Sequence, residues 1–139
     1  MPQIINSFPA PDPTTEDAPF WEACKRGELR FQRCTGCGRF RSPPTFACRT
    51  CQSFECEWVQ AFGPARLFSY TIVNILAYPG LSGDLPYIVG IVRFADMNDV
   101  GLVSNVVDAT PDALRTDMEL SLVWQEAAEG FLIPRFTPT

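Results

Sequence analysis

The chain contains no histidine and only one lysine, Lys25, among its 139 residues. The absence of histidine removes the commonest general base and the usual partner of a serine or cysteine nucleophile. It also removes every histidine-ligated catalytic zinc site. Schiff-base chemistry would depend on Lys25 alone. These absences argue against an enzyme that carries out a reaction by itself.

Long apolar runs are missing as well. No stretch of the sequence approaches the ~20 consecutive apolar residues that cross a bilayer as a helix. Residues 1–13 lack the basic start and apolar run of a secretory signal. Free thiols without an export signal predict a protein of the reducing cytoplasm, with no membrane segment. Apolar residues nevertheless make up 46% of the chain, which is enough for a packed core.

Four of the six cysteines, Cys34, Cys37, Cys48 and Cys51, form two C-x-x-C pairs separated by ten residues. Four thiolates that converge on one point make a tetrahedral site, which suits Zn²⁺ or a single iron. Such a site has no open coordination position, so we expect a structural metal. Two disulfides of a secreted domain, or four unrelated thiols, are the alternatives. The doubled C-x-x-C pattern favours the metal.

The remaining cysteines, Cys24 and Cys56, lie outside this set. Cys24 falls on the apolar side of a predicted helix, and Cys56 stands between two glutamates. Because the chain has no histidine to activate a thiol, we expect both to be structural.

Charge is unevenly distributed along the chain. The net charge is −5, yet between Lys25 and Arg49 seven basic residues stand against Glu28 alone. These basic residues either offset the negative charge of a four-thiolate metal site or contact an anionic ligand or an acidic partner. For the second role the candidates are Arg39, Arg41 and Arg49.

The N-terminal part predicts an arm followed by a short helix. Four prolines within residues 1–15 indicate an extended arm over residues 1–17. A helix is expected from about Ala18 to Arg26, with Asp17 as its N-cap and Gly27 at its C-terminal stop.

The apolar face of this helix would carry Phe20, Trp21 and Cys24. Phe20 and Trp21 either pack on the chain's own sheet or dock into another subunit, since Trp is enriched at interface hot spots.

The rest of the chain reads as β-structure. Residues 18–58 comprise the helix and then a strand–knuckle–strand–knuckle order typical of a zinc ribbon, ending in a strand over about Phe54–Val59. Residues 59–139 predict about five strands and one helical turn at Thr110–Leu114. These strands are rich in Val, Ile, Phe, Tyr and Thr. They are expected at Ala65–Ala77, Tyr87–Phe94, Gly101–Val107, Glu119–Trp124 and Phe131–Phe136.

The predicted fold is therefore mainly β. It consists of a short N-terminal helix, a Cys₄ zinc ribbon, and a C-terminal five-stranded barrel of OB-fold type. A β-sandwich is the competing architecture, although it would usually need more strands.

The order of these parts resembles a family of small proteins that join a rubredoxin-like zinc ribbon to an OB-fold. The resemblance covers about residues 20–138. It is carried by the segments FWEACKRGELRFQRCTGCG, CRTC, FGPARLFSYTIV, LPYIVGIVRF, GLVSNVV, DMELSLVW and GFLIPRFTP. The chain departs from the family pattern at Pro64-Ala65 and at Asp117, where the family usually has glycine.

This resemblance implies a non-catalytic accessory subunit that binds a thiolase-fold enzyme, with a hot-dog-fold hydratase as a further partner in some complexes. Such complexes act on CoA thioesters by Claisen or retro-Claisen reaction, aldol-type cleavage or acyl transfer. The resemblance implies structural zinc and a surface close to the partner's acyl-CoA entrance. Arg39, Arg41 and Arg49 then become candidates for contact with CoA phosphates.

Three other functions fit parts of the sequence. A nucleic-acid module would use Phe68, Tyr70, Tyr87 and Phe94 as stacking aromatics, but the acidic barrel would repel phosphates. A Cys₄ site can also hold iron and carry electrons. An independent enzyme would rely on Asp96, Asp99 and Asp108, although loop aspartates are usually turn-formers.

Overall fold

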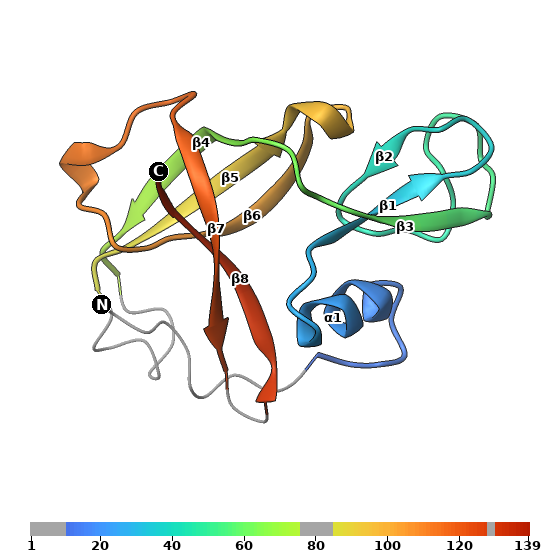
Figure 1. Cartoon of the computed structure of the whole chain (residues 1–139), viewed down its shortest axis with the longest axis horizontal. Coiled ribbons are helices and arrows are strands. Elements are labelled where there is room, and N and C mark those ends of the chain that lie inside the picture. The colour runs from blue at the N-terminus through green and yellow to red at the C-terminus, as the bar shows by residue number, and fades with distance from the viewer. Residues whose placement is uncertain (1–10, 76–84, 128–129) are drawn as a thin grey trace.

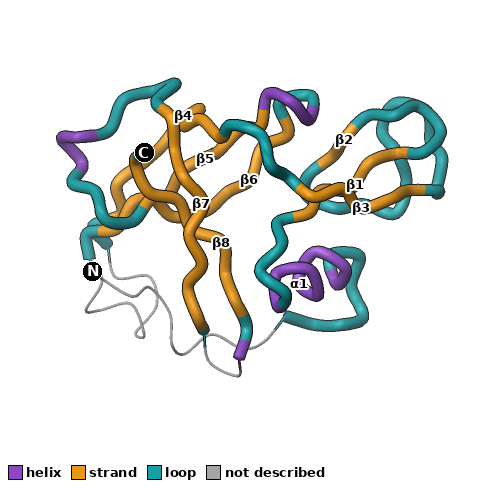
Figure 2. Tube along the Cα trace, in the orientation of Figure 1, coloured by secondary structure: helices purple, strands orange, loops and turns teal. Residues whose placement is uncertain are grey.

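The computed structural model describes residues 11–75, 85–127 and 130–139, and it is built mainly of strands. In Figure 1 a β-barrel lies on the left and a small three-stranded sheet on the right, with helix α1 (Ala18–Lys25) beneath that sheet. Figure 2 shows that α1 is accompanied only by short helical turns in the described part of the chain. The expected fold class is confirmed.

The small sheet is the ribbon. Its strands are antiparallel in the order β2-β1-β3, so that β1 is central. They are β1 (Arg30–Cys34), β2 (Phe40–Arg41) and β3 (Cys56–Gln60).

The barrel is closed and five-stranded, in the order β4-β5-β6-β8-β7. All neighbouring strands are antiparallel except β6 and β8, which are parallel. This arrangement is the predicted OB-fold, and it rules out the sandwich. The strands are β4 (Ala65–Val73), β5 (Tyr87–Phe94), β6 (Val100–Val106), β7 (Glu119–Glu126) and β8 (Leu132–Pro138).

Strand β4 is shorter than the sequence predicted. It ends at Val73, and Ile75 is already 77% exposed. The last two residues of the predicted strand, Leu76 and Ala77, lie outside the described residues.

The predicted helical turn near residue 110 is present as the 3-10 helix η3 (Pro111–Ala113), and a second one, η2 (Ala95–Met97), was not predicted.

Helix α1 lies where the sequence predicts it, and its two ends are capped differently. At its C-terminus Gly27 adopts φ +72°, Glu28 N–H donates to the Ala23 carbonyl, and Gly27 N–H donates to the Cys24 carbonyl. These two bonds form a Schellman motif. Asp17 is the N-cap residue, as predicted, but its side chain makes no capping bond and instead accepts a hydrogen bond from Trp21 Nε1 at 3.1 Å.

Ribbon, helix and barrel share one core. The rings of Phe31 in β1 and Phe94 in β5 lie 5.0 Å apart, and Phe20 and Cys24 of α1 belong to the same buried cluster. Lys25 also lies over the Phe131 ring, with Nζ 4.7 Å from its centroid. The ribbon is therefore anchored to the barrel through β1 and α1. Among the described residues, no helix is long and apolar enough to span a membrane.

Candidate metal centre

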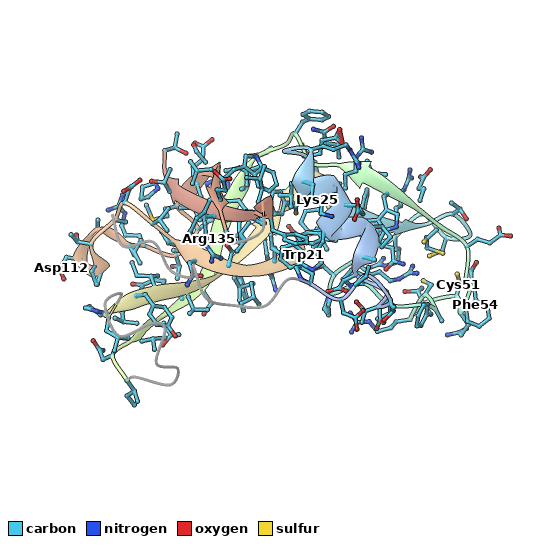
Figure 3. The ribbon with its side chains drawn as sticks, turned by 90° about the horizontal axis from the view of Figure 1, so that it is seen from below. Trp21, Lys25, Cys51, Phe54, Asp112 and Arg135 are labelled. Carbon is cyan, nitrogen blue, oxygen red and sulfur yellow. The ribbon has the colours of Figure 1, made fainter. Side chains whose placement is uncertain are left out.

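Two short turns, the knuckles, bring the four predicted ligands together. Cys34 is the last residue of β1, and Cys37 follows in the turn toward β2. Cys48 and Cys51 lie in the second turn, before β3. In Figure 3 sulfur atoms gather at one end of the molecule near Cys51, far from Asp112 at the other end.

The two knuckles repeat the same backbone hydrogen bonds. Gly38 N–H donates to the Cys34 carbonyl at 2.8 Å, and Gln52 N–H donates to the Cys48 carbonyl at 2.9 Å. The residue after each second cysteine takes a positive φ, +81° at Gly38 and +62° at Gln52. Glycine at position 38 suits this conformation, whereas the glutamine at position 52 gives no sequence signal for it.

The sulfur positions fit a single metal ion. The four Sγ atoms all lie within 4.8 Å of one another, with 3.5 Å between Cys34 and Cys51 and 3.6 Å between Cys37 and Cys48. A tetrahedral site with metal–sulfur bonds of about 2.3 Å places its sulfurs about 3.8 Å apart. All six cysteines are free thiols, so the arrangement matches a metal site rather than two disulfides.

Backbone N–H groups favour the ionised form of the inner ligands. The Cys37 N–H lowers the pKa of Cys34, and the N–H groups of Cys51 and Thr50 lower the pKa of Cys48 to about 6. The Ser53 N–H acts in the same direction on Cys51, yet the other sulfurs raise the pKa of Cys51 to about 11. Four crowded thiols cannot all ionise without a cation, so the cluster is built to receive one.

Space around the sulfurs is limited at Gly36. A Cβ there would lie 3.3 Å from Ser53 Cβ, 3.4 Å from Cys51 Sγ and 3.5 Å from Cys34 Sγ. Gly36 has no positive φ, so its role is the close approach of the backbone to two ligands. Cys34 and Cys48 are buried, whereas Cys37 and Cys51 are exposed, so the site lies at the surface.

The three candidate arginines occupy different environments. Arg39 and Arg49 are exposed beside the knuckles. Arg41 is only 6% exposed, and its Nη2 donates to the Thr45 carbonyl at 3.0 Å. Its Nε and Nη1 are buried without a hydrogen-bond partner. Of the three candidates, Arg39 and Arg49 are therefore accessible to a ligand, and Arg41 is not.

The other candidate residues are dispersed. Phe20 is buried and Trp21 is half-buried. Asp96, Asp99 and Asp108 are exposed, Asp96 within η2 and the other two at positive φ. Of the aromatics weighed for nucleic-acid stacking, Phe94 is in the core, Tyr87 is half-buried, and Phe68 carries the Arg93 guanidinium 3.4 Å from its ring centroid.

Cys24 and Cys56 also differ from each other. Cys24 is completely buried in α1, and its burial raises its pKa to about 12. Cys56 is exposed at the start of β3, and its sulfur accepts a hydrogen bond from Gln32 Nε2 at 3.3 Å. The structural role predicted for both thus fits the position of Cys24, while Cys56 is accessible.

Two protein-family models match consecutive parts of the chain. Residues 21–57 match the ChsH2 rubredoxin-like zinc ribbon domain, and residues 58–125 match the ChsH2 C-terminal OB-fold domain. A protein of Thermomonospora curvata described as a probable enoyl-CoA hydratase alpha subunit is 33% identical over 138 residues. The match covers 99% of this chain but 41% of that protein, so the chain spans about two fifths of its relative's length.

Two solved structures share the fold. A chain of the Ltp2-ChsH2(DUF35) aldolase superposes with a TM-score of 0.81 and 32% identity, covering 94% of this chain and 98% of that one. A DUF35 family protein of unknown function from Sulfolobus solfataricus has a TM-score of 0.61 at 18% identity, with 91% and 87% covered, which shows the fold alone. With its zinc-ribbon cysteines and closed barrel, the chain belongs to the ChsH2-type DUF35 family.

Proposed function

We propose that this protein is a non-catalytic, zinc-binding accessory subunit of a complex with a thiolase-fold enzyme that acts on acyl-CoA or related acyl donors. The observation that carries the proposal is the match over nearly the whole of both chains to a chain of the Ltp2-ChsH2(DUF35) aldolase. That structure is an aldolase named for two proteins, Ltp2 and ChsH2, and a subunit role for this chain follows by similarity.

The chemistry of the metal centre supports a structural role. All four ligands are cysteines, which favour Zn²⁺ and leave no position for a substrate or a reactive water. The chain has no histidine. Its aspartates at 96, 99 and 108 are exposed, and aspartates beside turns usually shape the turn. The reacting groups would then belong to the partner.

The reaction of the complex is proposed at the level of class. The resemblance implies Claisen or retro-Claisen chemistry, aldol-type cleavage or acyl transfer. The relative described as a hydratase subunit favours a second, hot-dog-fold partner in some assemblies. Each of these reactions uses a CoA thioester, whose phosphates would be neutralised by basic side chains.

Exposed side chains around the ribbon provide surface for such contacts. Arg39 and Arg49 remain candidates for a CoA phosphate or a partner carboxylate, while the burial of Arg41 favours an internal role. Phe46 and Phe54 lie in the knuckle region and are 68% and 76% exposed. Exposed aromatic and arginine side chains are typical of protein interfaces.

The test is purification of the tagged chain from its native cells at mild salt, with partners identified by mass spectrometry. A thiolase-fold protein in stoichiometric amount supports the proposal. Metal analysis of the same sample distinguishes zinc, which leaves the protein colourless, from iron, which makes it red-brown. Elution of the chain alone, or with nucleic acid, contradicts it.

With the complex in hand, the arginines can be tested separately. The double variant Arg39→Ala, Arg49→Ala should raise the KM for the CoA thioester while leaving kcat unchanged. Arg115→Ala, an exposed arginine of the barrel, is the matched control. An unchanged KM in an intact complex would remove the arginines from CoA binding without touching the subunit assignment.

A further inference from the structure

Cys56 stands directly opposite a metal ligand. In the pairing of β1 with β3, Cys34 is the register partner of Cys56. The flanking bond runs from Thr35 N–H to the Glu55 carbonyl, which makes Cys34 and Cys56 a non-hydrogen-bonded antiparallel pair. In such pairs the Cα atoms are about 4.5 Å apart and the side chains lie close on one face. That separation falls within the range that a disulfide spans, about 4.4–6.8 Å.

The contacts of Gln32 show on which face of the ribbon sheet the Cys56 sulfur lies. Gln32 lies two residues before Cys34 in β1, so the two side chains share a face of the sheet. The buried Gln32 side-chain amide makes two hydrogen bonds with the Thr45 backbone. Gln32 Nε2 donates to the Thr45 carbonyl at 2.8 Å, and the Thr45 N–H donates to Gln32 Oε1 at 2.9 Å. From this fixed position Gln32 Nε2 donates to Cys56 Sγ at 3.3 Å. The sulfur of Cys56 is thus held on the same face as the metal ligand Cys34.

Access differs between the two thiols. Cys34 is fully buried, whereas Cys56 is exposed to solvent. Cys56 is not one of the four clustered ligands, so a metal ion would leave its sulfur free to react. Of these two thiols, a soluble oxidant therefore reaches Cys56, and the buried Cys34 can act as the resolving thiol.

We propose that Cys56 is an oxidation site, and that its oxidation removes Cys34 from the set of metal ligands by forming a disulfide with it. Hydrogen peroxide oxidises the Cys56 thiolate to sulfenic acid and releases hydroxide. The Cys34 sulfur then attacks the Cys56 sulfur, a second hydroxide leaves, and a Cys34–Cys56 disulfide forms. The two sulfurs supply the two electrons that reduce the peroxide. Only Cys37, Cys48 and Cys51 would then be left to hold a metal ion, so the affinity for it would fall, and a dithiol reductant would reverse the step.

A direct attack on the ligands themselves would give different products. The closest ligand pairs are Cys34 with Cys51 and Cys37 with Cys48, so oxidation without Cys56 would link those pairs. Cys24 takes no part in either route, because it is completely buried in α1. The identity of the disulfide therefore distinguishes the two routes, and no partner protein is needed for the test.

The experiment treats the zinc-loaded full chain with hydrogen peroxide and follows released zinc with a chromogenic chelator. After thiol blocking, cleavage behind arginine and glutamate separates the peptide 34–39 from the dipeptide Cys56-Glu57 and from Cys51. Tandem fragmentation then distinguishes Cys34 from Cys37. We expect Cys34 linked to Cys56, and zinc release slowed roughly fivefold or more in Cys56→Ser.

The control is Cys24→Ala, which removes a cysteine that is neither a ligand nor accessible and should release zinc like the wild type. Both variants are checked for one zinc per chain before oxidation, and Cys56→Ala serves if serine alters loading. Equal release rates in wild type and both Cys56 variants, with links only among the four ligands, would overturn the proposal.

Discussion

At the residue scale, burial separates side chains that the sequence presents as equivalent. Arg39, Arg41 and Arg49 belong to one basic stretch, yet Arg41 is inside the ribbon and donates to the Thr45 carbonyl. We expect Arg41→Ala to lower the free energy of unfolding by about 1–2 kcal/mol, because it removes a buried hydrogen bond and leaves a cavity. Urea denaturation measures the change.

The exposed neighbours provide the comparison for Arg41. Arg39→Ala and Arg49→Ala should each change the free energy of unfolding by no more than about 0.5 kcal/mol, as is usual at exposed sites. If Arg41→Ala proves as harmless as these two, its guanidinium is not part of the ribbon's interior packing.

Thiol reactivity separates the two cysteines outside the metal set. Only the thiolate reacts with an alkylating agent, and burial raises the pKa of Cys24 to about 12. At pH 8 the thiolate fraction of Cys24 is therefore about one in ten thousand. In the native zinc-loaded protein we expect iodoacetamide to modify Cys56 and leave Cys24 intact, as read by peptide mass mapping. Modification of Cys24 at native pH would show that α1 opens.

At the element scale, helix α1 acts as part of the barrel's core. Phe20 is 8% exposed and meets Trp21 edge-on at 5.1 Å between ring centroids. Phe20→Ala should cost about 3–4 kcal/mol of folding free energy, since it removes a buried aromatic ring. Denaturation of the isolated chain measures this loss. Trp21→Ala is the control, with a smaller expected loss because that ring is half-buried.

The outcome decides between the two roles weighed for Phe20. A Phe20→Ala chain that is fully stable alone but fails to bind its partner would assign Phe20 to the subunit interface. A destabilised chain would assign it to the chain's own core, with Trp21 as the remaining interface candidate of the pair.

Sequence patterns predicted the elements better than their contacts. Cysteine spacing fixed the metal set because ligand geometry demands close sequence pairs, and glycine marked the end of α1 through its left-handed φ. Asp17 occupies the predicted N-cap position, but its carboxylate accepts a hydrogen bond from the Trp21 indole, one turn along the helix, instead of capping a backbone N–H. Similarly, β4 ends at Val73 although the apolar Ile75 follows Asn74, since strand pairing with β5 stops at Val73.

Contacts between residues that are far apart in the sequence could not be predicted from local sequence patterns. The opposition of Cys34 and Cys56 depends on the β1–β3 register, with 21 residues of knuckles and loops between the two positions. The burial of Arg41 depends on the Thr45 loop that folds over it. Both follow from how the ribbon closes, which spacing alone does not determine.

At the scale of the whole molecule, the barrel and the ribbon differ in what stabilises them. The barrel is closed and has its own apolar interior, with Leu67, Val92 and Phe136 fully buried. The ribbon has a two-residue strand β2 and long turns around the cysteines. Such small loop-rich modules gain much of their folding free energy from the bound metal.

Metal removal should therefore disorder the ribbon and leave the barrel folded. Cys34→Ser, or chelation of the wild type, should reduce amide-exchange protection at the knuckles by roughly a hundredfold or more, while β5 and β6 keep theirs. Hydrogen–deuterium exchange with mass spectrometry measures both regions in one sample.

Cys56→Ser is the control for metal removal, since it removes a neighbouring thiol but no ligand. Because Phe31 of the ribbon contacts Phe94 of the barrel, a modest drop in barrel stability is also expected. Unchanged protection around Cys37 and Cys48 in the metal-free chain would contradict a ribbon held together by its metal.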